Sequence, residues 1–302
     1  MATSSYLALF HDGTLRRRAG AAADAMRACT LCPRRCGVDR FVQPGTRCLT
    51  GAVPVVSACH PHFGEEAPLV GRSGSGTIFF GGCNLGCVFC QNWTTSRRQD
   101  AVEVSVERLA EMMVGLQKAG CHNINLVTPS HMVAQILAAL ELAVPLGLTI
   151  PLVYNTSGYD RAETLRLLDG VVDIYMPDVK FMRPETGARY AQAPDYAETA
   201  RDAVREMHRQ VGDLTLDAGG VAARGLLVRH LVMPGGLADT RDACRFLARE
   251  VSRDTYINLM AQYRTCGEAF RFQEIARRIT PAEFTAAVSI AREEGLWRLD
   301  GI

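Results

Sequence analysis

Residues 77–92 read TIFFGGCNLGCVFCQN, and this is the most informative stretch of the chain. The apolar run TIFFGG has the composition of a buried strand, and three cysteines, Cys83, Cys87 and Cys90, follow it at once. Three thiolates at this spacing can hold three irons of a [4Fe–4S] cube, whereas such cubes usually have four cysteine ligands. The fourth iron would then be open to another ligand.

Two other uses of the triplet are a zinc site and three ordinary buried thiols. Structural zinc normally takes four ligands, and the triplet supplies three. The loop also contains Gly81, Gly82 and Gly86, which tolerate the close backbone approach that wrapping a cluster requires. Phe89 puts an aromatic face beside the last cysteine. The spacing therefore favours an open cluster.

The triplet C-x3-C-x-aromatic-C, followed by Gln91 and Asn92, resembles the cluster loop of radical S-adenosylmethionine (SAM) enzymes. Within that superfamily the chain resembles the pyruvate formate-lyase activating enzymes of the PflX type, from about Cys29 to about Tyr263. The resemblance implies that SAM chelates the open iron. It also implies a 5′-deoxyadenosyl radical that abstracts hydrogen from a substrate, with Phe89 and Asn92 beside the cofactors.

The composition is that of a soluble globular protein, with 302 residues, 48% hydrophobic and 22% charged residues, and a formal net charge of +1. This charge gives no electrostatic case for nucleic acid. The apolar region 132–154 is interrupted by Gln135, Glu141 and Pro145, so we expect no membrane span. Eleven cysteines, clustered and without a signal peptide, indicate a reduced cytoplasmic metalloprotein.

A second group of cysteines precedes the first, at Cys29, Cys32, Cys36 and Cys48, with the spacing C-x2-C-x3-C-x11-C. Four thiolates can complete a zinc site or a closed iron–sulfur cluster, and the spacing favours zinc. Unligated thiols are the remaining alternative. We therefore expect an N-terminal helical or loop segment at 1–28, a cysteine-rich metal-binding element at 29–70, and one large domain at 71–302.

The large domain alternates strand-like and helix-like segments. Strands are predicted at 77–82, 122–128, 148–155, 171–178, 225–233 and 255–260, and helices at 105–119, 131–144, 160–168, 195–210, 239–251 and 281–294. Six such repeats predict an α/β fold with a parallel sheet. They are too few for a closed eight-stranded barrel, so we expect the partial (β/α)6 barrel of the TIM type that is usual in the resembling superfamily.

Polar residues stand at several predicted strand ends, where parallel α/β folds carry their chemistry. Asn125 and Thr128 lie where many activating enzymes have a Gly-Gly-Glu motif that contacts the SAM amine; the chain lacks that motif, so these two would substitute, or would only cap a loop. The turn formed by Asn155, Thr156 and Ser157 resembles one in the activating enzymes, and the resemblance implies that it holds SAM near a monovalent cation. An ordinary turn before a helix is the alternative.

Charged residues follow the next two strands. Asp178 and Lys180 match an Asp-x-Lys pair that faces SAM and substrate in the activating enzymes, and they could equally pair with each other. Asp173 is expected to be structural. Arg229 resembles an arginine near the SAM carboxylate; because alternate strand residues face opposite sides, we expect Arg229 and not His230 to face the interior.

Two further stretches have less decided roles. In HPHFGEE, the side chains of His60, His62, Glu65 and Glu66 could bind a metal, close the cluster's top or lie in a solvated loop. Gln262 and Tyr263 follow the last predicted strand, and Tyr263 could line the substrate pocket or cap the core.

The leading hypothesis is thus an oxygen-sensitive radical SAM enzyme with a [4Fe–4S] cluster, supplied with electrons by a donor such as flavodoxin. Its substrate would be a glycine of a partner glycyl-radical enzyme, or a small metabolite or peptide. The hypothesis from another class is a non-catalytic iron–sulfur or zinc protein that transfers electrons or senses redox state. That alternative does not explain the polar strand ends.

Overall fold

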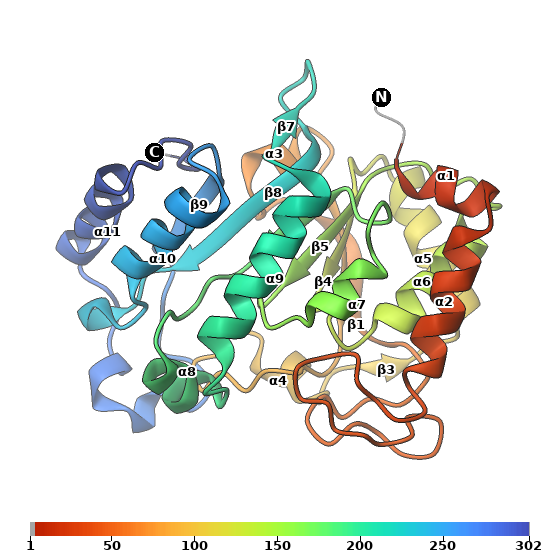
Figure 1. The fold of residues 1–302 in the computed structure, drawn as a ribbon, viewed down its shortest axis with the longest axis horizontal. Coiled ribbons are helices and arrows are strands. Elements are labelled where there is room, and N and C mark those ends of the chain that lie inside the picture. Colours follow the sequence, from red (N-terminus) through yellow and green to blue (C-terminus); the bar gives the residue numbers. More distant parts are fainter. Residues whose placement is uncertain (1–3, 302) are drawn as a thin grey trace.

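One mixed sheet forms the core of the computed structural model, which describes residues 4–301 (Figure 1). Six of its strands are parallel and pair in chain order: β2 (Ser75–Phe80), β4 (Ile124–Val127), β5 (Leu152–Thr156), β6 (Ile174–Pro177), β8 (Ala222–Leu231) and β9 (Tyr256–Met260). Each overlaps one of the six predicted strand ranges, so the predicted succession of parallel strands is confirmed.

The central strands are covered on both faces. Every residue of β4, β5 and β6 is buried. Burial on both faces explains why these segments read as nearly continuous apolar runs without the alternation of a half-exposed strand. Polar residues in such strands are therefore exceptions that need a partner or a function.

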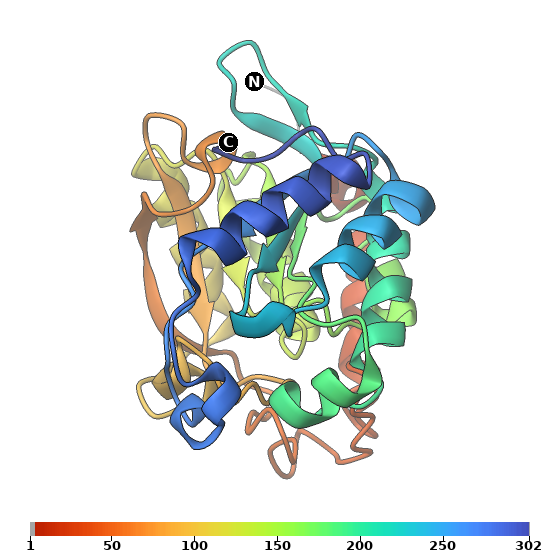
Figure 2. The ribbon, with the colours of Figure 1, turned by 90° about the vertical axis from the view of Figure 1, so that its left-hand side faces the viewer.

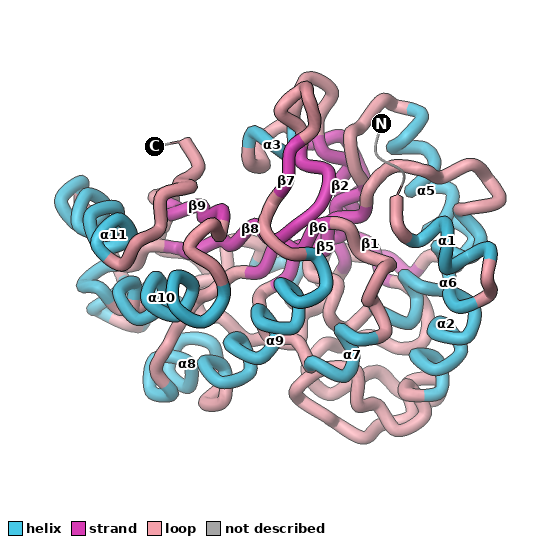
Figure 3. Tube along the Cα trace, turned by 45° about the horizontal axis from the view of Figure 1, so that its top comes forward, coloured by secondary structure: helices cyan, strands magenta, loops and turns pink. Residues whose placement is uncertain are grey.

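Six helices follow the six parallel strands in turn: α5 (Val106–Lys118), α6 (Val133–Ala143), α7 (Ala162–Arg166), α9 (Tyr196–Val211), α10 (Thr240–Phe246) and α11 (Pro281–Glu293). Figure 3 shows the strands at the centre and these helices around them. Helix α10 continues into a π-helical turn, η2 (Leu247–Val251). Ser105 caps the first of these helices, because its hydroxyl accepts a hydrogen bond of 3.1 Å from the Arg108 amide.

Two helices, α1 (Tyr6–His11) and α2 (Thr14–Asp24), lie in the segment 1–28 that was expected to be helical or loop, and α2 packs against α6. Strand β1 (Val55–His62), which was not predicted, pairs antiparallel with β2. Short elements complete the chain: β3 (Val102–Glu103), β7 (Thr215–Leu216), α3 (Ala67–Val70), α4 (Trp93–Ser96), α8 (Pro184–Ala191), η1 (Pro234–Gly236), η3 (Ala269–Arg271) and η4 (Gln273–Ile275). His60 and His62 lie in β1, so the alternative of a solvated loop does not hold for these two residues.

The long segment between α2 and β1, residues 25–54, contains no helix or strand. It lies at the same end of the molecule as α4 and α8, opposite the hairpin that joins β7 to β8 (Figures 1 and 2). The predicted cysteine-rich element, residues 29–70, is thus made of this irregular segment together with β1, which belongs to the central sheet.

The sheet is an open one. Its strand order is β3-β1-β2-β4-β5-β6-β8, with β7 and β9 both paired to β8. The partial-barrel curvature stays a prediction, whereas the mixed α/β fold with a central sheet is observed. Within residues 4–301, none of the helices combines the length and the apolar composition needed to cross a bilayer.

Candidate active site

A cavity of about 580 Å³ lies at the carboxyl ends of the parallel strands. Residues from the ends of five of them, β2, β4, β5, β8 and β9, and from the segment after β6, line it. All three cysteines of the triplet, Cys83, Cys87 and Cys90, are on its wall. Topology thus gathers into one cavity groups that are dispersed along the sequence from His62 to Asp300.

Backbone hydrogen bonds hold the cysteine loop to two other segments of the chain. The amide of Gly82 donates to the carbonyl of Thr95 at 2.8 Å, and that of Gly86 donates to the carbonyl of Ala191 at 3.1 Å. Gly82 has φ = +83°, and a Cβ atom there would stand 2.1 Å from the carbonyl oxygen of Cys48. Only glycine fits at this position, both for its conformation and for its close approach to the second cysteine segment.

The three thiols suit a multi-iron cluster better than a single ion. Burial raises the pKa of Cys83 to about 11 and that of Cys87 to about 12, so without a metal both are neutral. Among residues 4–301, no three His, Cys, Asp or Glu side chains are arranged to hold one metal ion. Cube ligands bind different irons and need no common centre. The donor set therefore fits the predicted [4Fe–4S] cluster with one iron unligated by protein.

Phe89 and Asn92 also line the cavity. The Phe89 ring packs edge-on against Phe181, with 5.9 Å between ring centroids, and tilted against Tyr263 at 6.2 Å. The Tyr263 hydroxyl donates to the Ile275 carbonyl at 2.8 Å, so this tyrosine caps the core while its neighbour Gln262 faces the cavity. These aromatic contacts fix the loop's last cysteine.

The two residues predicted after the second strand lie differently. Thr128 is on the cavity wall with φ = +60°, a conformation that is a genuine outlier for a β-branched residue. Strain of this kind persists where surrounding structure enforces it, and it clusters at functional sites. Asn125 is fully buried, does not line the cavity, and neither polar atom of its amide has a partner among the residues described.

Asn155, Thr156 and Ser157 all line the cavity at the end of β5. Thr156 is held from behind, because its hydroxyl donates to the buried carboxylate of Asp160 and stands 3.0 Å from the hydroxyl of Ser130. The buried Ser157 hydroxyl has no partner within the described part of the chain. The turn thus presents an amide and hydroxyl groups to whatever fills the cavity.

Asp178 and Lys180 form an ion pair on the cavity wall after β6. Burial disfavours the ammonium, but the Asp178 carboxylate outweighs this effect and raises the pKa of Lys180 above its ordinary value. The backbone amide of Lys180 donates to the Tyr196 hydroxyl at 3.0 Å, which anchors the segment. The pairing that the sequence left as an alternative is therefore present, and the pair still faces the cavity.

Arg229 and His230 face opposite sides of β8, as alternation predicts. Arg229 lines the cavity, whereas the buried ring of His230 lies 2.7 Å from the Val179 carbonyl and 3.0 Å from the Thr240 hydroxyl. The Arg229 guanidinium is already bound to carboxylates of the protein. It donates to Glu66 at 2.7 and 2.6 Å and also contacts Glu65.

Sequence reasoning missed the groups that complete this network. Asn258, in β9, donates to Glu66 at 2.7 Å, and Asp300 near the carboxyl terminus also lines the cavity. Asn258 could have been predicted, because its side-chain amide is an exception in the otherwise largely apolar strand TYINLM. Asp300 had no such sign, because the chain returns to the sheet there only through the tertiary fold.

Of the remaining expected residues, Asp173, His60 and the four N-terminal cysteines lie outside this cavity, whereas His62, Glu65 and Glu66 line it. Asp173 is structural: it accepts hydrogen bonds from the amides of Ser5 at 3.1 Å and Leu152 at 3.0 Å. His60 is exposed and stacks on Phe79, so it shares no metal site with Glu66. The four N-terminal cysteines line a separate small cavity together with Arg34, Arg40, Arg47 and His131, and the predicted zinc site is not shown.

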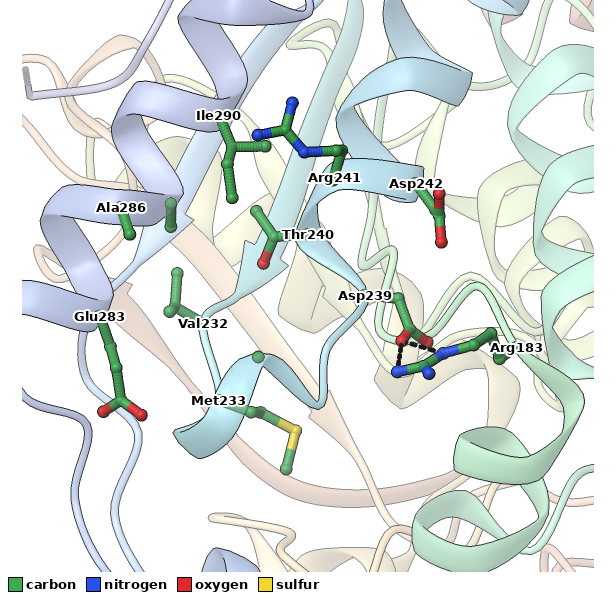
Figure 4. Close-up of a pocket in the computed structure, with 12 residues that line it drawn as sticks. Arg183, Val232, Met233, Asp239, Thr240, Arg241, Asp242, Glu283, Ala286 and Ile290 are labelled. Carbon is green, nitrogen blue, oxygen red and sulfur yellow. Dashed lines mark hydrogen bonds and ion pairs between the residues drawn. The ribbon is translucent and has the colours of Figure 1, made fainter.

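Another cavity, of about 390 Å³, lies between α10, α11 and η1 (Figure 4). The pair Arg183–Asp239 closes one side of it, and Glu283 and Arg241 project from the two helices. None of the residues predicted to act in binding or catalysis lines it. The cavity at the carboxyl ends of the strands is therefore the candidate active site.

Comparison with known proteins bears on the same region. Residues 77–219 match the sequence model of the radical SAM superfamily. Over 285 residues, 91% of this chain, the sequence is 30% identical to an uncharacterized protein of Methanocaldococcus jannaschii, of which 77% is covered. A radical SAM methyltransferase from Sphaerobacter thermophilus is a structural neighbour with a TM-score of 0.47 and 14% identity, over 73% of this chain and 64% of that one. The chain thus spans less than two thirds of that neighbour's length.

Proposed function

Because the chain belongs to the radical SAM superfamily, we propose that the cavity at the strand ends holds a [4Fe–4S] cluster and SAM and generates a 5′-deoxyadenosyl radical. The observation that carries the proposal is the presence of three cysteines, and no fourth, on the wall of one cavity that polar strand ends also line. When bound, the cluster would supply one electron that breaks a C–S bond of SAM, releasing methionine and the radical.

Cys83, Cys87 and Cys90 would each hold one iron and leave the fourth open for the methionine end of SAM. Gly82 and Gly86 bring the loop backbone close to its neighbours, and Phe89 packs the loop against the core. These residues would thereby hold three irons of the cluster and leave the fourth without a protein ligand. Unligated thiols or a fully ligated transfer cluster would not require such an opening.

The polar groups around the opening suit a zwitterionic cofactor that also carries a sulfonium. Lys180 can attract a carboxylate, and Asp178 can attract an ammonium or a sulfonium. Thr128, Asn155 and the unpartnered hydroxyl of Ser157 can hydrogen-bond to the amine, carboxylate or ribose. We assign Asn125 a supporting role behind them.

The role expected of Arg229 is revised in this proposal. Its guanidinium is saturated by Glu66 and Glu65, so it holds these carboxylates in the cavity wall and does not grip the SAM carboxylate. With Asp300 also present, the floor of the cavity carries more carboxylates than cations. Such a floor favours the positive charge of SAM or of a substrate.

The substrate belongs to one of two classes, a glycine of a partner glycyl-radical enzyme or a small metabolite or peptide. The activating-enzyme resemblance of the cysteine loop supports the first. A cavity of about 580 Å³, within the range of roughly 300–1,000 Å³ typical of small-molecule sites, accommodates the second. A one-electron donor such as flavodoxin is the partner that either class requires.

The test is anaerobic reconstitution with iron and sulfide, followed by dithionite and SAM, with chromatographic detection of 5′-deoxyadenosine. We expect wild-type protein to produce it and Cys87→Ala to produce none. Cys59→Ala is the matched control, because Cys59 is a half-buried cysteine of β1 outside the cavity. A fully iron-loaded wild type that leaves SAM intact, or a Cys87→Ala variant that still cleaves it, would contradict the proposal.

A further inference from the structure

The irregular segment between α2 and β1 brings four cysteines into one small cavity. Cys29, Cys32 and Cys48 are buried, Cys36 is half-buried, and all four line that cavity. Backbone hydrogen bonds close the two turns that carry them: the Cys29 amide donates to the Val38 carbonyl at 2.9 Å, and the Gly45 amide donates to the Thr50 carbonyl at 2.9 Å. The sequence spacing is thus realised as a spatial cluster.

Gly45 shows how closely the backbone approaches the sulfur atoms. A Cβ atom at this position would stand 2.6 Å from the Sγ atom of Cys48 and 4.0 Å from that of Cys36. Any other residue would therefore push its side chain into the space between two of the thiols. A glycine at this point keeps that space free.

The cavity is surrounded by positive charge without a carboxylate. Arg34, Arg40 and Arg47 line it, and its lining contains no Asp or Glu. Arg40 is only 2% exposed, and its four hydrogen bonds go to neutral oxygens: the carbonyls of Thr50, Gly51 and His131 and the Thr50 hydroxyl. The Nη2 atom of Arg34 is buried without any partner among residues 4–301.

A buried guanidinium that lacks an anion is costly, so this arrangement calls for a negative group. Four protonated thiols do not supply one. Four thiolates on a metal centre do, because metal binding deprotonates cysteine and leaves a net negative complex, whether the centre is zinc or an iron–sulfur cluster. Four sulfur donors in one cavity and uncompensated arginines around it are independent observations that point to the same kind of ligand.

We propose that Cys29, Cys32, Cys36 and Cys48 bind a second metal centre, separate from the catalytic cluster, whose thiolate charge is neutralised by Arg34, Arg40 and Arg47. In the structure the sulfur atoms share a cavity but do not converge on one ion. Metal binding therefore draws residues 29–48 together. A segment of this length without helix or strand gains order from such binding.

The centre also braces the catalytic loop. Arg34 donates to the carbonyl of Asn84 at 2.9 Å, and Arg47 donates to that of Leu85 at 3.3 Å, within the stretch between Cys83 and Cys87. The Cys48 carbonyl lies against Gly82 on the other side of Cys83. Loss of the second metal should consequently loosen residues 82–85 as well as residues 29–48.

The test measures metals in anaerobically purified protein and does not depend on SAM cleavage. In a Cys83→Ala, Cys87→Ala, Cys90→Ala triple variant, we expect each chain to keep either about one zinc or about four irons. Either metal supports the proposal, and the amounts of zinc and iron per chain show whether the centre is a zinc site or an iron–sulfur cluster. A triple variant that is folded by circular dichroism and holds neither metal overturns it.

The converse variant is Cys32→Ala with Cys36→Ala. We expect it to lose that second metal while retaining the catalytic irons, and to exchange amide hydrogens faster at residues 29–48 and 82–85. Cys121→Ala with Cys244→Ala, two buried cysteines outside both cavities, is the control and should change neither metal content nor exchange. If the Cys32/Cys36 variant does not fold, the triple variant alone still decides the question. Unchanged metal content in a folded Cys32/Cys36 variant also overturns the proposal.

Discussion

The guanidinium of Arg229 is bound at two points by the carboxylate of Glu66, with hydrogen bonds of 2.7 Å from Nε and 2.6 Å from Nη2. Both side chains are largely buried, and they come from β8 and from the turn before α3, 163 residues apart. Bidentate pairs of this kind are the strongest that arginine forms. The pair ties the segment that follows β1 to the far side of the sheet, across the floor of the cavity.

Breaking this pair should destabilise the protein strongly. In Arg229→Met, Glu66 and Glu65 lose the cation that offsets their burial, and removing one partner of a buried pair costs about 3–5 kcal/mol. Adding Glu66→Gln should restore part of the loss. Urea unfolding measures both, with Arg108→Met as control, since its exposed pair with Glu111 contributes at most about 1 kcal/mol. If Arg229→Met and Arg108→Met lowered the free energy of unfolding by equal amounts, the Arg229–Glu66 pair would not have the stabilising role proposed here.

Replacing Lys180 by methionine should make the catalytic cluster harder to reduce. The Lys180 ammonium shares the cavity with Cys87, and a nearby cation stabilises the more negative, reduced state. We expect the reduction potential to fall by on the order of 1 kcal/mol, or roughly 40 mV for one electron. Potentiometric titration followed by electron paramagnetic resonance measures it. Lys118→Met, exposed at the end of α5, should leave the potential unchanged, and a potential that rises in Lys180→Met would contradict the prediction.

A methyl group at Gly82 should disrupt the cysteine loop. The left-handed conformation costs an alanine residue about 1–2 kcal/mol, and its Cβ atom would also collide with the Cys48 carbonyl. We expect Gly82→Ala to lower both the unfolding midpoint and the iron retained per chain. Gly20→Ala is the matched control: it lies in α2 with open space around it, and should stabilise by up to about 1 kcal/mol. Full iron retention by Gly82→Ala would show that the close approach is unimportant.

His230 should make stability fall in mild acid. Burial lowers the pKa of His230, so between its folded pKa and the ordinary value of about 6.5 the unfolded chain binds a proton that the folded chain does not. Stability therefore rises with pH in that window, by at most about 1.4 kcal/mol per pH unit for one group. Comparing urea midpoints at pH 7.5 and 5.5 should show a smaller drop in His230→Asn than in wild type. Some drop should remain, because burial also lowers the pKa of His131, to about 4.

Much of the fold could be predicted, because apolar runs and helix-capping residues are visible in short stretches of the sequence. The runs LTIPLVYN and VVDIYMPD contain strands that are buried throughout, and such strands need apolar residues on both faces. The first helix of the large domain was predicted to within a residue at each end, since Ser105 and Gly120 are local start and stop signals. Strand β1 was missed because His60, Pro61 and His62 lack an apolar pattern, and its antiparallel pairing with β2 compensates for that.

The candidate site was predictable where residue type alone set the chemistry. Three cysteines within eight residues, and polar groups at the ends of apolar strands, mark the cavity because a parallel sheet brings all strand ends to one edge. The sequence contains no comparable pattern for residues that pair with each other across the sheet. Nothing in the sequence joins Glu66 to Arg229, or Asp300 to the same floor, since these contacts span 163 residues and more.

The succession of parallel strands and helices and the identity of the sulfur donors follow from hydrophobic periodicity and ligand spacing, which are local properties of the chain. Which charges are paired and which are not depends on how the chain folds. In the folded protein, Arg229 is bound by the carboxylate of Glu66, and Arg40 donates only to neutral oxygens. The carbonyl oxygen of Cys48 lies against Gly82. Those outcomes depend on distances between remote segments, and close packing of the whole domain settles such distances.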